Sequence, residues 1–278
     1  MKQEGGQRIL GTYKLASTPQ QPVVSVITVV YNSEKLLERT IENILSQTYH
    51  NIELIIVDGG SKDGTLEIIK KYNDRISYWV SEKDNGLYHA MDKGLQLATG
   101  DYVWYINSGD LIFDETTTEK IFAENRTDAD IYYGDTLYVN GNYEPIGLRN
   151  DITNKKLPAQ LSVDSFQYGM VICHQAFIMK RSIVARYDLQ YKYVSDYDWE
   201  IACTKNAKTA IHTHQVLAKF LTEGFSTKHR KASVKEKYKV MIKHWGFVIG
   251  NLNYLTNAFK AAFSFLKRKK YVKEYGIQ

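Results

Sequence analysis

Cysteine is scarce in this chain, and long apolar runs are absent from its sequence. The 278 residues include two cysteines, Cys173 and Cys203, which do not form a C-x-x-C pair. The pattern predicts neither a zinc site nor a disulfide framework, and it suits a reducing compartment. No apolar run approaches the roughly 18 residues that span a bilayer, and residues 1–21 lack the apolar centre of a signal peptide. We therefore expect a cytoplasmic protein.

Two signatures of nucleotide-binding enzymes are also missing. No G-x-G-x-x-G follows the first predicted strand, which argues against a dehydrogenase. The Gly-rich, Arg-containing phosphate loop of a sugar nucleotidyltransferase is absent from the same region, as are internal repeats and low-complexity stretches. With 44% hydrophobic residues, the chain has enough apolar material for one large domain and a modest appendage.

Three short apolar runs predict buried strands. Residues 22–32 and 52–58 are almost continuously apolar before a polar end, which is typical of strands covered on both faces. Residues 102–106 combine aromatic and β-branched types, which favour the interior of a sheet.

Helical spacing of apolar residues appears between these runs. It predicts a helix over 36–45, with Ser33 as a plausible cap, and a second helix over 87–95. Strands and helices that alternate in this way predict an α/β fold with a mostly parallel central sheet flanked by helices.

Carboxylates follow two of the predicted strands. Asp58 ends the second strand, and Asp110 closes the turn Asn107-Ser-Gly-Asp after the third. Taken alone, Ser-Gly-Asp would be an ordinary turn. Open α/β sheets bind ligands at the carboxyl ends of their strands, so this edge is predicted to accommodate a nucleotide phosphate with a divalent metal.

Four segments together resemble glycosyltransferase family 2 of the bacterial surface-polysaccharide type. They are residues 25–32 (SVITVVYN), 56–65 (IVDGGSKDGT), 82–88 (EKDNGLY) and 107–110 (NSGD). The resemblance covers about residues 22–226 and implies a GT-A fold.

The resemblance also implies a division of the chain. Residues 1–21 would be an N-terminal extension, and residues 22–227 the catalytic domain. Within that domain, residues 22–112 would bind the nucleotide-sugar and residues 113–227 the acceptor. Residues 228–278 would form a helical basic segment.

The residues that would hold the nucleotide-sugar follow from the same resemblance. A strand-end carboxylate such as Asp58 is rigidly aimed and acceptor-only, which suits a base or ribose. Asp84 has a second reading as a helix N-cap. The complete expected set is Thr28, Tyr31, Asn32, Asp58, Gly60, Asp84, Gly86, Asn107 and Ser108.

Asp110 is the expected ligand for Mn²⁺ or Mg²⁺. Family members carry an Asp-x-Asp-like cluster here, whereas this chain has Asn107 and Ser108, which leaves one strong ligand. Such cations are often held by one or two carboxylates together with substrate phosphates and water.

The resemblance places the general base at the start of a late helix. Asp196 matches the family's Asp, and Asp198 is its competitor two residues on, with helix capping as the alternative role of either. On the acceptor side, His174 and Gln175 would face the site, although His174 also reads as a structural histidine.

Residues 223–226 resemble a Gly-Gly-x-Ser segment of relatives, which makes Gly224 and Ser226 further candidates. Glu223 replaces the first glycine of that segment. Specificity is expected in the loops of residues 134–170, where Gly141, Pro145, Gly147 and Pro158 interrupt any regular pattern.

Charge is concentrated at the C-terminal end. Residues 228–278 hold 13 Lys or Arg and two Glu, a local balance of +11, and the rest of the chain carries −6. Aromatic and aliphatic residues beside the lysines suit a helix on an anionic membrane surface. A helical pair packed on the catalytic domain fits the pattern equally well. Nucleic-acid binding is not expected, because the acidic catalytic part would repel phosphates.

The resemblance to glycosyltransferase family 2 implies an inverting glycosyltransferase. It would move a sugar from a nucleoside-diphosphate donor, UDP-linked by expectation, to a hydroxyl of a glycan or lipid-linked acceptor in cell-surface polysaccharide synthesis. The expected location is the cytoplasm, with peripheral contact at the inner face of the membrane. The alternative is a non-catalytic scaffold that keeps the fold and binds glycan or a partner.

Overall fold

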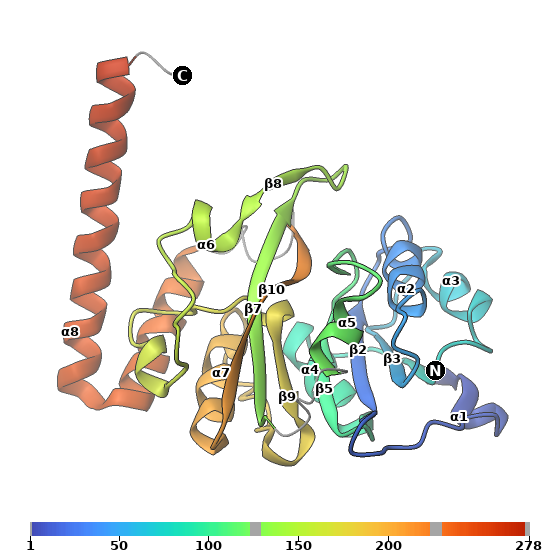
Figure 1. Cartoon of the computed structure of the whole chain (residues 1–278). Coiled ribbons are helices and arrows are strands. Elements are labelled where there is room, and N and C mark those ends of the chain that lie inside the picture. Colours follow the sequence, from blue (N-terminus) through green and yellow to red (C-terminus); the bar gives the residue numbers. More distant parts are fainter. Residues whose placement is uncertain (1, 123–128, 223–229, 276–278) are drawn as a thin grey trace.

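The computed structural model describes residues 2–122, 129–222 and 230–275, which form one mixed sheet flanked by helices (Figure 1). The strands are β1 (Gln3–Gly5), β2 (Val24–Val30), β3 (Ile52–Asp58), β4 (Tyr78–Ser81), β5 (Tyr102–Tyr105), β6 (Leu111–Ile112), β7 (Ile131–Val139), β8 (Pro145–Leu148), β9 (Phe177–Lys180) and β10 (Ala210–Leu221). The α-helices are α1 (Gln7–Leu10), α2 (Leu37–Leu45), α3 (Thr65–Lys71), α4 (Leu87–Leu97), α5 (Thr117–Phe122), α6 (Arg149–Ile152), α7 (Ser195–Asn206) and α8 (Arg230–Tyr275). Short 3-10 helices span Val163–Phe166 (η1), His174–Ala176 (η2) and Arg181–Ile183 (η3).

Strands β2, β3, β4 and β5 run parallel, as the alternating pattern predicts. Every residue of β2 is buried, which explains its continuous apolar sequence. Helix α4 packs closely on this layer, since a Cβ added at Gly94 would lie 2.5 Å from Cγ2 of Ile27. The four parallel strands therefore form a rigid base for the loops at their carboxyl ends.

The second half of the chain extends the same sheet. β9 pairs antiparallel with both β5 and β7, β7 pairs parallel with β10, and β6 pairs antiparallel with β10. The sheet order is β1-β4-β3-β2-β5-β9-β7-β10-β6, with β8 beside β7. The turn after β5 therefore lies next to strands contributed by residues 131–221.

The predicted N-terminal extension contains secondary structure. β1 pairs antiparallel with β4 at the edge of the sheet. The Arg8 guanidinium forms an ion pair with the buried carboxylate of Glu53 and donates to the carbonyl of Leu97 over 2.7 Å. Residues 2–10 are therefore attached to the sheet and to the end of α4.

The basic segment folds as a helix interrupted at Gly246, whose φ of 77° and ψ of 172° are not helical. The first arm (residues 230–245) packs on α7, and the second arm (residues 247–275) returns beside it as the long red helix of Figure 1. Among the helices within the described ranges, none combines the length and apolar character that crossing a membrane requires.

Two local predictions are wrong. Ser33 does not cap α2, which begins at Leu37 without a side-chain cap, because the Ser33 hydroxyl lies 2.8 Å from that of Ser108. Residues 134–170 are also more regular than expected. β7 continues to Val139, and β8 includes both Pro145 and Gly147, since a strand that pairs on one side tolerates both residue types.

Candidate active site

Asp58 ends β3 and organises the loop that follows. Its buried carboxylate accepts the Ser81 hydroxyl over 2.6 Å and the Ser61 backbone amide over 3.1 Å. The predicted ligand Gly60 lies in this loop with a φ of 82°, a conformation that favours glycine. The carboxylate therefore fixes the loop at the carboxyl end of β3.

Asp84 lies against the same loop. A Cβ added at Gly59 would lie 2.5 Å from Oδ2 of Asp84, so Gly59 lets the carboxylate approach. Oδ1 of Asp84 accepts the Gly86 amide over 2.9 Å. The capping position of α4 is occupied by Gly86, so the alternative reading of Asp84 as the N-cap is wrong.

Three predicted ligands of the nucleotide-sugar lie in β2 or directly after it: Thr28, Tyr31 and Asn32. Their surroundings differ. Tyr31 is exposed, and Asn32 accepts the Lys62 amide over 2.8 Å at a positive φ of 47°. Thr28 is fully buried, and its hydroxyl donates to the carbonyl of Ile106 over 2.8 Å. A ligand contact by Thr28 therefore stays a prediction, while its observed bond joins β2 to the end of β5.

The turn after β5 brings the next group of predicted residues to this edge. The Ser108 hydroxyl contacts that of Ser33, and the Asp110 amide donates to the carbonyl of Asn107 over 2.9 Å. The buried Asn107 Oδ1 has no hydrogen-bond partner within the described residues. An unpaired buried oxygen of this kind is a candidate ligand atom.

Asp110 is held by residues from the second part of the chain. Its Oδ2 accepts the Gln175 side-chain amide over 2.6 Å, and its Oδ1 accepts the Leu221 backbone amide over 3.0 Å. Burial raises the pKa of Asp110 to about 7, although both hydrogen bonds act to lower it. Gln175, predicted on the acceptor side, therefore orients the predicted metal ligand.

The donor atoms of this turn fit a divalent cation held mainly by its substrate. Within the described residues no three His, Cys, Asp or Glu side chains gather as a metal-binding group. Asp110 keeps free lone pairs beyond its two hydrogen bonds, and Asn107 offers an unpaired oxygen. One carboxylate and one amide oxygen, completed by phosphates and water, are a plausible donor set for Mg²⁺ or Mn²⁺.

Asp196 lies in the first turn of α7, as predicted, and contacts helix α4 from the first part of the chain. Its Oδ1 accepts the hydroxyl of Tyr88, from α4, over 2.9 Å. Burial raises the pKa of the Asp196 carboxyl, while the bond from Tyr88 acts in the opposite direction. The carboxylate is therefore a stronger proton acceptor than an exposed aspartate.

Asp198 has different partners. It is buried, and its carboxylate contacts Nζ of Lys243 at 2.9 Å and Nε2 of His244 at 2.8 Å. Both partners lie on the first arm of α8, so the observed contact attaches that arm to α7. Between the two aspartates, this arrangement favours Asp196 as the proton acceptor.

His174 lies in a buried aromatic environment. Its ring centroid lies 5.0 Å from that of Tyr105 and 5.4 Å from that of Trp199, and neither ring nitrogen has a hydrogen-bond partner within the described residues. Burial lowers the pKa of His174 to about 3, so the ring is neutral near pH 7. An acceptor contact by His174 stays a prediction.

Two residues near the proposed base were not found by sequence reasoning. Tyr88 was quoted as part of a motif but had no role, because its partner is 108 residues away. Glu200 lies one turn after Asp196 and is fully buried, with neither carboxylate oxygen paired within the described residues. The i, i+4 spacing from Asp196 was the available signal.

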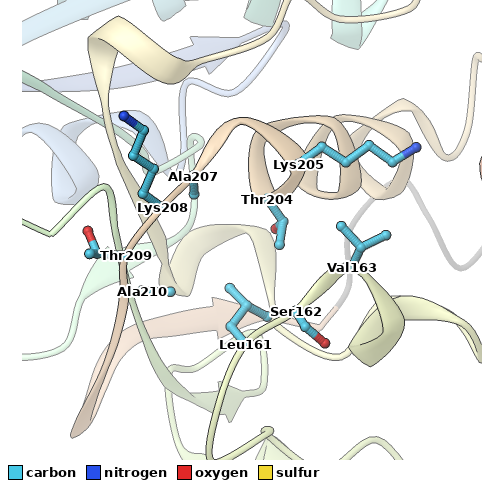
Figure 2. A pocket seen from close by; sticks show the side chains of 9 residues that line it. All are labelled: Leu161, Ser162, Val163, Thr204, Lys205, Ala207, Lys208, Thr209 and Ala210. Atoms are coloured by element: carbon cyan, nitrogen blue, oxygen red, sulfur yellow. The ribbon is translucent and has the colours of Figure 1, made fainter.

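A cavity of about 380 Å³ lies between η1, the end of α7 and the start of β10 (Figure 2). None of the predicted site residues lines it. The segment with Gly224 and Ser226 lies outside the described residues.

Solved structures identify the class of fold. S. aureus TarS residues 1–349 in complex with UDP has a TM-score of 0.62 at 17% identity, covering 92% of this chain and 75% of that one. A mannosyltransferase, PcManGT from Pyrobaculum calidifontis, in complex with GDP-Man and Mn²⁺, has a TM-score of 0.60 at 20% identity, covering 83% and 66%. The chain spans 39% of the longer S. aureus TarS structure. The fold is GT-A-like, as predicted.

Sequence comparisons identify the family. The family described as Glycosyl transferase family 2 matches residues 25–188, and the chain belongs to it. A PGL/p-HBAD biosynthesis glycosyltransferase of Mycobacterium bovis is 28% identical over 208 residues, covering 72% of this chain and 77% of that protein. An uncharacterized glycosyltransferase of Rickettsia typhi is 26% identical over 227 residues, covering 79% and 70%. The predictions of the family and of an enzyme are confirmed.

Proposed function

We propose that the protein is an inverting glycosyltransferase that uses a nucleoside-diphosphate sugar. One observation carries the proposal. Asp58 ends β3, Asp84 and Asp110 follow β4 and β5 of the same parallel layer, and the Tyr88 hydroxyl donates to Asp196. Tyr88 lies two residues after Gly86, a predicted ligand of the nucleotide-sugar. Its hydrogen bond therefore links the proposed donor site to Asp196, the proposed proton acceptor.

The proposed donor is UDP-linked. Asp58, Asp84 and Asn32 would bind the nucleoside, and the turn at Asn107 and Ser108 would approach the diphosphate. The S. aureus TarS structures in complex with UDP and with UDP-GlcNAc support a uridine nucleotide. The mannosyltransferase in complex with GDP-Man makes a guanosine nucleotide the alternative.

Mn²⁺ or Mg²⁺ is the proposed cofactor, with Asp110 and Asn107 as its protein ligands. When bound, the cation would neutralise charge on the departing diphosphate. The Gln175 amide would keep the Asp110 carboxylate in one orientation, because its hydrogen bond of 2.6 Å is made inside the protein.

Asp196 is the proposed general base. The acceptor hydroxyl oxygen would attack the anomeric carbon from the face opposite the diphosphate, and the bond from that carbon to the diphosphate oxygen would break with its electron pair. The hydroxyl proton would pass to Asp196. A single displacement of this kind inverts the anomeric configuration.

The proposed acceptor is a hydroxyl of a glycan or lipid-linked glycan in cell-surface polysaccharide synthesis. His174, Gln175 and the segment around Asp198 belong to the proposed acceptor half, residues 113–227. We also propose a cytoplasmic location at the inner face of the membrane. The M. bovis relative, a biosynthetic glycosyltransferase, is in keeping with such an acceptor.

Replacement of the base provides the test. In Asp196→Asn, we expect the release of nucleoside diphosphate in the presence of acceptor to fall by about 10² to 10⁴, while donor affinity stays unchanged. Asp74→Asn is the matched control, because Asp74 is exposed and remote from these strand ends. Before this test, titration calorimetry with UDP, GDP and dTDP, each with Mn²⁺ or Mg²⁺, would identify the nucleotide of the donor. Wild-type turnover in Asp196→Asn would overturn the assignment.

A further inference from the structure

The second arm of α8 exposes a row of large apolar side chains. Phe247 is 72% exposed, Val248 71%, Leu252 58% and Leu255 53%. The last three recur at i, i+4 and i+7, which places them on one face of the helix. A contiguous apolar face of this kind marks an interaction surface.

The opposite side of this arm is occupied by the first arm. A Cβ added at Gly250 would lie 2.8 Å from Cδ1 of Ile242, so the two arms touch there. The Tyr254 ring lies 5.0 Å from that of Tyr238, and the Tyr238 hydroxyl donates to Oδ1 of Asn251 over 3.1 Å. The apolar row therefore belongs to the side that the hairpin leaves open.

The hairpin is fixed to the catalytic domain, so the open face has a defined position. Val240 and Met241 are buried, and the Glu236 carboxylate accepts the Tyr193 amide over 2.8 Å. Lys243 and His244 contact Asp198 on α7, the helix whose first turn contains Asp196.

Charge decides between two occupants of this face. The segment of residues 228–278 carries +11, so two copies packed face to face would repel each other. An anionic lipid surface would attract the same charge and accept the apolar row. The basic cluster at 267–270 lies beyond the residues whose side chains the structure describes, and only its sequence enters here.

We propose that the second arm of α8 lies on an anionic membrane surface, with Val248, Leu252 and Leu255 inserted among the lipids. The proposal rests on the proposed membrane location of the enzyme, but not on its sugar chemistry. It would place α7 and Asp196 near the surface where a lipid-linked acceptor is found.

Vesicle sedimentation of the full chain is the test. We expect binding to phosphatidylcholine vesicles that contain phosphatidylglycerol, weak binding to phosphatidylcholine alone, and release at high salt. Val248→Glu should lower the partition coefficient about tenfold or more. Val234→Glu is the matched control, because Val234 is 42% exposed on the first arm and lies outside the row.

Two further measurements make the outcomes decisive. Circular dichroism and UDP release with a soluble acceptor should be the same for both variants, which separates a failure of this inference from a failure of the proposed chemistry. Equal vesicle binding by Val248→Glu and wild type would overturn the proposal. A concentration-dependent dimer that Val248→Glu abolishes would assign the face to a second copy instead.

Discussion

The hydroxyl of Tyr88 is one of the contacts that join residues before and after position 113 at the candidate site. It donates to Asp196 and favours the ionised carboxylate, whereas burial opposes ionisation. In Tyr88→Phe the pKa of Asp196 should rise further, so the acid limb of the pH profile of kcat/KM should move to higher pH. At mildly acidic pH we expect about a tenfold loss, the worth of one hydrogen bond to a charged group.

The pH profile separates this role from simple packing. The loss should shrink as the pH rises, because Asp196 then ionises without help. Tyr49→Phe is the control, since its hydroxyl donates to Pro22 near the amino end of β2, away from the site. A uniform loss at every pH in Tyr88→Phe would contradict the proposed effect on the pKa.

The buried carboxyl group of Glu200 should make the free energy of unfolding depend on pH. Burial and the nearby charge of Asp196 raise the pKa of Glu200 well above its ordinary value. As the pH rises above the ordinary value of about 4.3, the unfolded chain loses this proton while the folded protein keeps it, so the free energy of unfolding falls by up to ~1.4 kcal/mol per pH unit.

The variant Glu200→Gln removes this dependence, because its amide does not titrate. In urea unfolding at pH 5 and pH 8, the free energy of unfolding of the variant should increase relative to that of the wild type as the pH rises. If the difference in the free energy of unfolding between the two proteins stayed constant, Glu200 would not carry the proton in the folded state.

The sequence was sufficient to locate candidate site residues that lie at the ends of predicted strands. Asp58 and Asp110 follow apolar runs, so the strand-end rule located them without a structure. The bonds from Gln175 to Asp110 and from Tyr88 to Asp196 join residues 65 and 108 positions apart. No periodicity or spacing encodes such pairs, because they depend on how β9 and α7 dock beside β5 and α4.

At the scale of elements, the strands β2, β3 and β5 and the helices α2 and α4 were predictable, and the break in α8 was not. A lone glycine inside a helical pattern is tolerated, so Gly246 gave no clear signal. The sequence of the basic segment therefore fits both a membrane-bound helix and a helical pair packed on the rest of the chain. In the structure the first arm packs on α7, and the second arm keeps an apolar face exposed.

The turn at Gly246 is a testable element. Its φ of 77° and ψ of 172° are essentially restricted to glycine, so alanine would cost about 1 to 3 kcal/mol there. We expect Gly246→Ala to open the hairpin rather than unfold the catalytic domain. Small-angle scattering should then show a larger radius of gyration at an unchanged melting temperature.

A second glycine with positive φ provides the control. Gly11, at a φ of 71°, has open space for a Cβ and lies far from α8 in the sequence. Gly11→Ala should leave the radius of gyration unchanged. Unchanged scattering in Gly246→Ala would show that the second arm holds its place without the glycine turn.

At the scale of the whole molecule, the proposed donor and acceptor halves share one sheet. β9 joins β5 to β7, and β6 from the first half pairs with β10 from the second. We therefore expect residues 22–227 to unfold as one unit, with equal calorimetric and van't Hoff enthalpies in a scan of the full chain. Two resolved transitions within the catalytic domain would contradict this coupling.

The fold class and the family of the molecule could be predicted from the sequence, because they depend on whole segments and not on single contacts between distant residues. Alternating apolar runs define an α/β sheet, and the four motifs define the family. The antiparallel strands β7, β8 and β9 were not predicted as a set. Their order in the sheet is decided by contacts between distant segments, and their sequences are interrupted by Gly and Pro.

The short strand β1 has a consequence for the behaviour of the protein in concentrated solution. It covers β4, whose backbone donors and acceptors would otherwise form an open sheet edge. An open edge of this kind recruits strands from neighbouring molecules. The edge strand is now β1, which has three residues and is followed by the Arg8–Glu53 ion pair, so we expect it to offer neighbouring molecules a shorter edge than the four residues of β4 would.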